Sequence, residues 1–175
     1  MIGQTIGQYT ILEHIGEGGM GVVYKAQDNK LQRIVALKFL PHHMAQGTVE
    51  QTRFLQEAQA AAVLNHPNIC VIHDVREEDG KQFIVMEFVE GKTIRETIKS
   101  GSVKLDQAID FALQIAEALE EAHKKGIVHR DIKADNIMIN TKNQIKVMDF
   151  GLAKLKGSLK LTRTSSTVGT LAYMA

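Results

Sequence analysis

The spacing of the apolar residues changes once along this chain, close to residue 90, and that change limits the folds open to it. Before it, short apolar and β-branched runs alternate with glycine-rich or polar turns, as in antiparallel strands. The expected strands are 9–15, 22–27, 33–40, 69–74 and 82–88, with a polar turn at 77–80 before the last. A capping-box pattern at Thr48 and Gln51, followed by helical spacing from Phe54 to Leu64, predicts one helix among them.

Helical spacing dominates after residue 90. Thr93 and Glu96 form a second capping-box pattern before a short helix, and a long helix is expected from Asp106 to about 124–126. One face of the long helix carries Ile109, Ala112, Leu113, Ala116 and Leu119. The expected fold is α+β, with a five-stranded antiparallel domain containing one helix at 1–88 and a mainly helical domain at 89–175.

Composition excludes several classes of function. Hydrophobic residues make up 44% and charged residues 23% of the chain, as in ordinary globular proteins. A net charge of +1 gives no long-range field to hold nucleic acid or an anionic bilayer, so neither is an expected partner. No apolar run reaches the roughly 18 to 20 residues of a membrane segment, and 1–10 lacks the features of a leader, so a cytoplasmic chain is expected. The single cysteine, Cys70, lies in an apolar stretch and is expected to be a buried structural thiol.

The turn after the first expected strand reads GEGGMGVV from Gly16 to Val23 and fits the pattern GxGxxGxV. Three fixed glycines at this spacing arise by chance about once in twenty chains of this length. A dinucleotide-binding turn would open a helix at its last glycine, whereas β-branched residues follow Gly21 and predict a strand. Glycines in such a flap let backbone amides approach phosphate oxygens. An ordinary glycine hairpin remains the alternative.

Lys38 lies at the end of the apolar run 35–38, where a buried ammonium needs an anionic partner. Glu57 falls on the same face of the expected helix as Phe54 and Leu64, the face expected to turn inward. Together the two residues predict an ion pair that holds phosphates. The alternative is that each is simply solvated, with the lysine ammonium reaching water along its stem.

The most specific signal is the segment HRDIKADN from His129 to Asn136, followed by DFG at 149–151. Five fixed residues in the spacing HRDxKxxN arise by chance at a rate on the order of one in ten thousand. The glycine turn, the strand lysine and these two motifs, in this order, resemble the protein kinase family over residues 9–175. Phrases such as IGEGGMGVVYKA and VHRDIKADNIM most resemble the eukaryotic-like serine/threonine kinases of bacteria. The resemblance implies a kinase N-lobe and the first part of a C-lobe.

The resemblance implies a role for each catalytic side chain. Asp131 would accept the proton of the substrate hydroxyl, and Asn136 and Asp149 would bind Mg²⁺. Lys38, oriented by Glu57, would hold the α- and β-phosphates of ATP. These residue types suit the reaction because phosphoryl transfer needs anionic oxygens neutralised and two reactants aligned.

ATP and Mg²⁺ are the implied cofactors. The implied nucleotide-binding residues are Ile15, Gly16, Glu17, Gly18, Gly19, Met20, Gly21, Val23, Ala36, Lys38, Glu87, Val89 and Met138. Of these, Ile15, Val23, Ala36 and Met138 would sandwich adenine, and the backbone of Glu87 and Val89 would bond it. Met86 would be the gatekeeper, and His129 matches a structural histidine that packs beneath Phe150. Core packing is an equal alternative for Ile15 and Val23.

Lys133, a second ammonium, and Thr170 match the serine/threonine branch of the family. The implied partner is therefore a protein substrate with a Ser or Thr hydroxyl. Arg130 before Asp131 also resembles kinases whose activation loop is phosphorylated. The candidate acceptors for self-phosphorylation are Thr162, Thr164, Ser165, Ser166 and Thr167. A solvated, unmodified Ser/Thr loop is the alternative.

The chain departs from the family at residue 175, where the family continues with Pro-Glu and the remaining C-lobe helices. The apolar face of Ile109, Leu113 and Ala116 is therefore expected to be poorly covered, and the fragment alone to be inactive. Two functions stay open: a protein kinase seen as a fragment, and a catalytically silent ATP-binding regulatory module. The complete set of catalytic residues favours the first.

Overall fold

The computed structural model describes residues 1–18, 21–40, 52, 55, 56, 58, 59, 61–101 and 103–150. The chain divides into two compact units. The first unit comprises Met1–Ala62 and Val71–Phe88, and the second comprises Val63–Cys70 and Val89–Ala175. Each unit is built around a sheet of its own.

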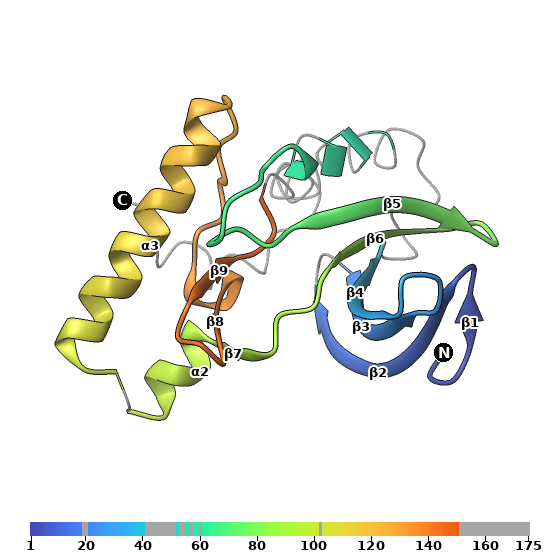
Figure 1. Ribbon diagram of the computed structural model, residues 1–175, viewed down its shortest axis with the longest axis horizontal. Helices are drawn as coiled ribbons and strands as arrows, with labels where there is room; N and C mark the ends of the chain where they lie inside the picture. The colour runs from blue at the N-terminus through green and yellow to red at the C-terminus, as the bar shows by residue number, and fades with distance from the viewer. Residues whose placement is uncertain are drawn as a thin grey trace, which may run out of the picture. The chain divides into compact units, whose positions relative to one another are not determined.

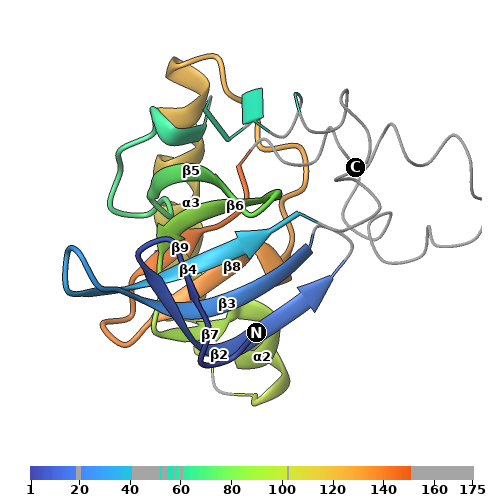
Figure 2. The same cartoon turned by 90° about the vertical axis from the view of Figure 1, so that its right-hand side faces the viewer.

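The first unit contains a six-stranded antiparallel sheet. Its strands are β1 (Thr5–Ile6), β2 (Tyr9–Gly18), β3 (Gly21–Asp28), β4 (Arg33–Phe39), β5 (Ile72–Glu78) and β6 (Lys81–Glu87), in the order β1-β2-β3-β4-β6-β5. Figure 1 shows the curl of β2, and Figure 2 shows β2, β3 and β4 side by side. The expectation of five strands is wrong by one, because β1 pairs with the start of β2. A strand of two residues carries no periodicity that a sequence pattern could reveal.

The other elements of the first unit follow the expected pattern. Asp79 and Gly80 join β5 to β6 with φ values of 51° and 70°, the left-handed conformation of tight hairpin turns. The described residues between 52 and 62 are helical, which agrees with the expected helix. The capping-box residues Thr48 and Gln51 lie outside the described residues.

The core of the first unit lies on one face of this sheet. Its buried members are Ile6, Tyr9, Ile11, Ala26, Val35, Leu37, Phe39, Phe83 and Val85. The rings of Phe39 and Phe83 pack within it, with centroids 5.0 Å apart. Side chains alternate along a strand, so Leu37 points into this core while its neighbours Ala36 and Lys38 take the opposite face.

The second unit combines a small sheet with two helices. Its elements are β7 (Gly91–Thr93), α2 (Ile94–Lys99), α3 (Leu105–Lys124), the short 3₁₀ helix η1 (Ala134–Asn136), β8 (Ile137–Asn140) and β9 (Ile145–Val147). The strands lie in the order β7-β8-β9, and α3 packs beside β9 (Figure 1). The capping box of α2 is confirmed: the Thr93 hydroxyl accepts the N–H of Glu96 at 3.1 Å, and the Glu96 carboxylate accepts the N–H of Thr93 at 2.7 Å.

The expected strand at 69–74 is wrong in its first half. β5 begins only at Ile72. Ile69 instead forms a parallel bridge with Val147 of β9, and the N–H of Cys70 donates to the carbonyl of Val147 at 3.0 Å. Residues 69–74 therefore contribute to both sheets. A local apolar pattern does not reveal which residues pair with which sheet. Cys70 is buried, as expected.

Two apolar faces run along α3. Phe111, Ala118 and Ala122 are buried on one of them. Ile109 and Leu113 lie on the other and are 53% and 60% exposed, which confirms the poor cover expected for that face. Across the described residues, no helix has the length and apolar character that a bilayer crossing requires.

Candidate active site

Several expected nucleotide-binding residues form one row across the sheet of the first unit. Val23 on β3 pairs with Gly16 on β2 and with Lys38 on β4. Lys38 pairs in turn with Ile84 on β6. Residues directly opposed in antiparallel strands point to the same side, so Val23 and Lys38 share the face opposite the core. The sequence analysis did not include Ile84, whose place depends on the pairing of β4 with β6.

A second row lies two residues away along β4. Ala36 pairs with Met86 on β6, and the two are 4% and 7% exposed. Ala36 and Lys38 share a face because they are two residues apart on a strand. The residue expected to contact adenine and the expected gatekeeper are therefore cross-strand neighbours beside Lys38.

Lys38 itself is only 4% exposed, which is rare for a lysine. A buried ammonium is retained where anionic or polar groups compensate its lost hydration. The expected partner Glu57 lies outside the described residues, as do positions 19 and 20 of the glycine turn. Gly18 and Gly21, on either side of them, pair with each other at the end of the β2–β3 hairpin.

The remaining expected nucleotide contacts are divided between the two units. Ile15 and Glu17 on β2 are exposed, Ile15 by 46%. The backbone N–H of Glu87 already donates to the carbonyl of Val71 at 2.9 Å, so a bond from Glu87 to adenine would use its carbonyl oxygen. Val89, which is buried, and Met138 on β8 belong to the second unit.

In the second unit, the loop that leads into η1 gathers three expected catalytic side chains. Lys133 Nζ donates to Asp131 Oδ2 at 3.0 Å. Asn136 Nδ2 donates to the same carboxylate oxygen at 3.2 Å and to the backbone carbonyl of Asp131 at 2.8 Å. Asp131 is 5% exposed, so these side chains take the place of water around it. Its carboxylate is thereby fixed in orientation, as a general base requires.

The same bonds orient the amide of Asn136. Its nitrogen faces Asp131, so its oxygen Oδ1 is directed away from that carboxylate. The Asn136 carbonyl accepts the N–H of Met148 at 2.8 Å, which joins this loop to the residue before Asp149. An amide oxygen and a carboxylate are ligands that Mg²⁺ prefers. Within the described ranges, no three His, Cys, Asp or Glu side chains are grouped to hold a metal.

His129 connects the two segments from a buried position, 1% exposed. Its Nδ1 accepts the N–H of Asp131 at 3.3 Å, so Nε2 carries the proton and donates to the carbonyl of Met148 at 2.7 Å. Burial lowers the pKa of His129, against opposing effects of the Met148 carbonyl and of the charges on Asp149 and Asp131. Its ring packs edge-on against Phe150, with centroids 4.7 Å apart. The contact expected between His129 and Phe150 is therefore present.

Acid is expected to destabilise the second unit through His129. Its pKa in the folded chain is lower than the unfolded value near 6.5, so its contribution to stability is present above pH 6.5 and is lost as the pH falls below it. One pH unit below 6.5 the loss is at most about 1.4 kcal/mol. Urea unfolding at pH 7.5 and pH 5.5 measures it.

The matched variants for this measurement are His129→Gln and His123→Gln, because His123 is exposed near the end of α3. Burial also lowers the pKa of His73 in the first unit, so only the difference between the variants isolates His129. The His129 variant is expected to lose part of the pH dependence and the His123 variant to keep it. Equal pH dependence in both would contradict the assignment.

The residues that directly follow His129 and its hydrogen-bond partner Met148 have strained backbone conformations. Arg130 and Asp149 have φ values of 67° and 60°, which only a few per cent of non-glycine residues adopt. Such residues cost on the order of 1 to 3 kcal/mol and persist where the surroundings over-determine them. The hydrogen bonds of His129 to the N–H of Asp131 and the carbonyl of Met148 supply that constraint.

An ion pair that the sequence analysis missed lies beside residues 129–136, the catalytic loop. Arg95 Nε on α2 is bonded to Asp135 Oδ1 in η1. The hydrogen bond from Arg95 is the main cause that lowers the pKa of Asp135, and the charges of Arg95 and Lys133 add to it. The two residues are 40 positions apart, and neither belongs to a pattern that names the other. Thr170 and the phosphoacceptor candidates at 162–167 lie outside the described residues.

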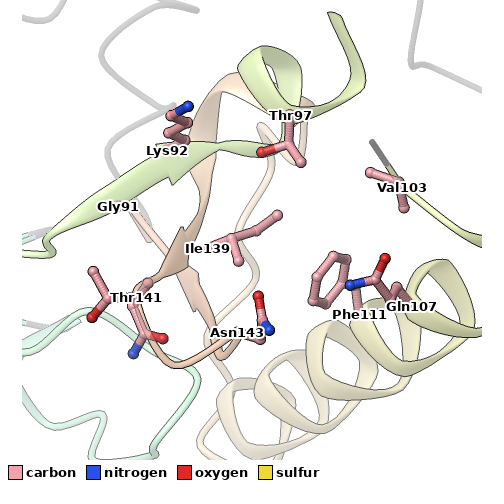
Figure 3. Close-up of a pocket in the computed structure, with 10 residues that line it drawn as sticks. Gly91, Lys92, Thr97, Val103, Gln107, Phe111, Ile139, Thr141 and Asn143 are labelled. Carbon is pink, nitrogen blue, oxygen red and sulfur yellow. The ribbon is translucent and has the colours of Figure 1, made fainter. Parts of the chain in front are cut away.

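The second unit also contains a cavity of about 330 Å³ between β7, β8, α2 and α3 (Figure 3). Lys92, Thr97, Gln107 and Asn143 supply polar groups, and Ile139 forms part of its apolar wall together with Phe111 and Val103. None of the expected site residues lines it. The cavity therefore does not account for nucleotide binding.

The chain thus combines a curled antiparallel sheet that contains the buried lysine Lys38 with a loop in which Lys133 and Asn136 hold Asp131. The chain belongs to the protein kinase domain family, whose model matches residues 9–175. The match includes strands β2 to β6 of the first unit and the catalytic loop of the second.

The relatives that match the chain include bacterial serine/threonine-protein kinases. The chain is 45% identical to the serine/threonine-protein kinase PrkC of Bacillus subtilis and 42% identical to a probable serine/threonine-protein kinase of Clostridium perfringens, in each case over 100% of its own length. It spans about a quarter of the length of these relatives (27% and 26%). The crystal structure of the Mycobacterium tuberculosis PknI kinase domain matches 87% of this chain with a TM-score of 0.77 at 31% identity, and the match covers 62% of that domain.

Proposed function

We propose that this chain is the ATP-binding and catalytic part of a protein serine/threonine kinase. The observation that carries the proposal is the environment of Asp131, a buried carboxylate held by Lys133 and Asn136 at 3.0 and 3.2 Å. That arrangement suits a group that accepts a proton in one fixed direction. Residues 1–88 are assigned mainly to nucleotide contact and residues 89–175 to catalysis.

In this reaction, Asp131 accepts the proton of a Ser or Thr hydroxyl while the hydroxyl oxygen forms its bond to the γ-phosphorus of ATP. The bond from that phosphorus to the β–γ bridging oxygen breaks, and ADP leaves. Lys133, next to the reacting carboxylate, offsets charge on the transferred group, and Lys38 holds the α- and β-phosphates. Glu57 orients Lys38, and Thr170 is a residue by which the chain matches the serine/threonine branch.

The residues present fit Mg²⁺ as the metal. Asn136 directs Oδ1 away from Asp131. Asp149 directly follows Met148, whose N–H donates to the carbonyl of Asn136. Mg²⁺ is usually held by one or two such oxygen ligands together with phosphates and water. When bound, it would neutralise charge on the phosphate oxygens. ATP is supplied in the cytoplasm, and we propose that the chain acts there.

A basic protein incubated with the full-length protein, magnesium and γ-labelled ATP tests this function. Label in phosphoserine or phosphothreonine is the expected result. ATP-dependent thermal stabilisation without transfer would favour the second function left open by the sequence, a catalytically silent ATP-binding module.

We also propose that the kinase phosphorylates itself between residues 162 and 167, because Arg130 precedes Asp131 and is exposed as a partner for a phosphate. Phosphopeptide mapping of the active protein is expected to find phosphate on one or more of Thr162, Thr164, Ser165, Ser166 and Thr167. Full activity with these five residues unmodified would remove Arg130 from any activation step.

A further inference from the structure

Lys133 contacts Asp131 and lies two residues before Asp135, a second carboxylate of its own loop. Its Nζ donates to Asp131 Oδ2 at 3.0 Å, and its charge also stabilises the ionised form of Asp135. A lysine ammonium is a compact charge on a flexible stem and can turn from one acceptor to another. An ammonium drawn to Asp135 would leave Asp131 without one of the side chains that orient it.

Arg95 forms an ion pair with Asp135. Its Nε is bonded to Asp135 Oδ1, and the two side chains are 40% and 42% exposed. An ion pair this exposed contributes little to stability, because water screens it and two long side chains lose freedom. Its position next to the catalytic loop therefore points to a role other than stability.

The backbone holds Arg95 where it can reach this carboxylate. β7 pairs with β8 through Thr93 and Met138, and a Cβ at Gly91 would lie 2.0 Å from a carbonyl oxygen of β8, so the two strands are in close contact. α2 follows β7 directly, and η1 directly precedes β8. Arg95, two residues after Thr93, and Asp135, three before Met138, consequently lie at the same end of this strand pair.

We propose that Arg95 is a positioning residue that keeps Asp135 from competing with Asp131 for the ammonium of Lys133. The proposal rests on the phosphotransfer function given above and adds a residue from α2 to the control of its catalytic loop. Removal of Arg95 would free a carboxylate two residues from Lys133. Replacement of Asp135 as well would remove the competing carboxylate, and Lys133 would again pair with Asp131.

Steady-state kinetics of the full-length protein separate this role from a purely structural one, in which the ion pair only holds α2 beside η1. Arg95→Ala and Arg95→Gln are expected to lower kcat about threefold to tenfold with little change in the KM for ATP. The double variant Arg95→Ala with Asp135→Asn is expected to recover to within about twofold of the wild type. Lys124→Ala, which breaks an exposed ion pair with Glu120 on α3, is the control for loss of a surface charge. A double variant as slow as Arg95→Ala, or slower, overturns the proposal.

The crystal structure of the Arg95→Ala variant provides a readout that does not depend on activity. Lys133 Nζ is expected within hydrogen-bond distance of Asp135 in that variant and back on Asp131 in the double variant. Lys133 unmoved on Asp131 in the single variant also overturns the proposal. A wild-type protein that transfers no phosphate would refute the kinase function, and the position of Lys133 in the variant would still decide the role of Arg95.

Discussion

Asp131→Asn is expected to lower the turnover of phosphoryl transfer by about 10²- to 10⁴-fold, the range for loss of a general base, while MgATP still binds. The asparagine oxygen can still accept the hydrogen bond that Lys133 donates at 3.0 Å, so the loop geometry should survive. What is lost is the group that takes the hydroxyl proton. Turnover and ATP-dependent thermal shift, measured on the same preparation of full-length protein, separate the two effects.

Asp110→Asn is the matched control for this substitution. Asp110 is exposed on α3, where it accepts a hydrogen bond from Gln114 at 2.8 Å. The control is expected to keep both the turnover and the thermal shift of the wild type. Unchanged turnover in Asp131→Asn would remove Asp131 from the mechanism.

Lys38→Met is expected to abolish self-phosphorylation and to weaken MgATP binding. Lys38 is buried at the centre of the row that Gly16, Val23 and Ile84 form, so an apolar side chain of similar length fits there but provides no charge for the phosphates. Glu57→Ala is expected to have the same effect less completely, because it removes only the partner that orients the lysine.

Lys81→Met, at the exposed first residue of β6, is the control for loss of a lysine from the same sheet. Nucleotide affinity by titration calorimetry and label incorporation by self-phosphorylation are the measurements. Full self-phosphorylation in Lys38→Met would show that the buried strand lysine does not hold phosphates.

The sequence predicted the elements whose signal is local. The glycine turn between two strands, the apolar strand ending near Lys38 and the capping box at Thr93 and Glu96 all depend on neighbours within a few residues. The loop around Asp131 could also be predicted, because the spacing of its motif is too specific to arise readily by chance.

Features that depend on pairing between distant segments were missed or misplaced. Ile69 was placed in β5 because it is apolar and β-branched, yet it pairs with Val147 of the second unit. Arg95 was not considered because only the β7–β8 pairing brings it to Asp135. The pattern on α3 showed the face of Ile109 and Leu113 without indicating that another face, with Phe111, would be the buried one.

Single-turnover transfer from bound ATP tests the central claim most directly, because it follows one phosphate on this protein. The full-length protein is loaded with a stoichiometric amount of γ-labelled ATP and magnesium, mixed with excess protein substrate and quenched over time. The account predicts that the label passes from ATP to serine or threonine in the wild type and stays in ATP in Asp131→Asn. Label that remains in ATP, or is released as free phosphate, in the wild type would contradict the assignment of this chain as a protein serine/threonine kinase.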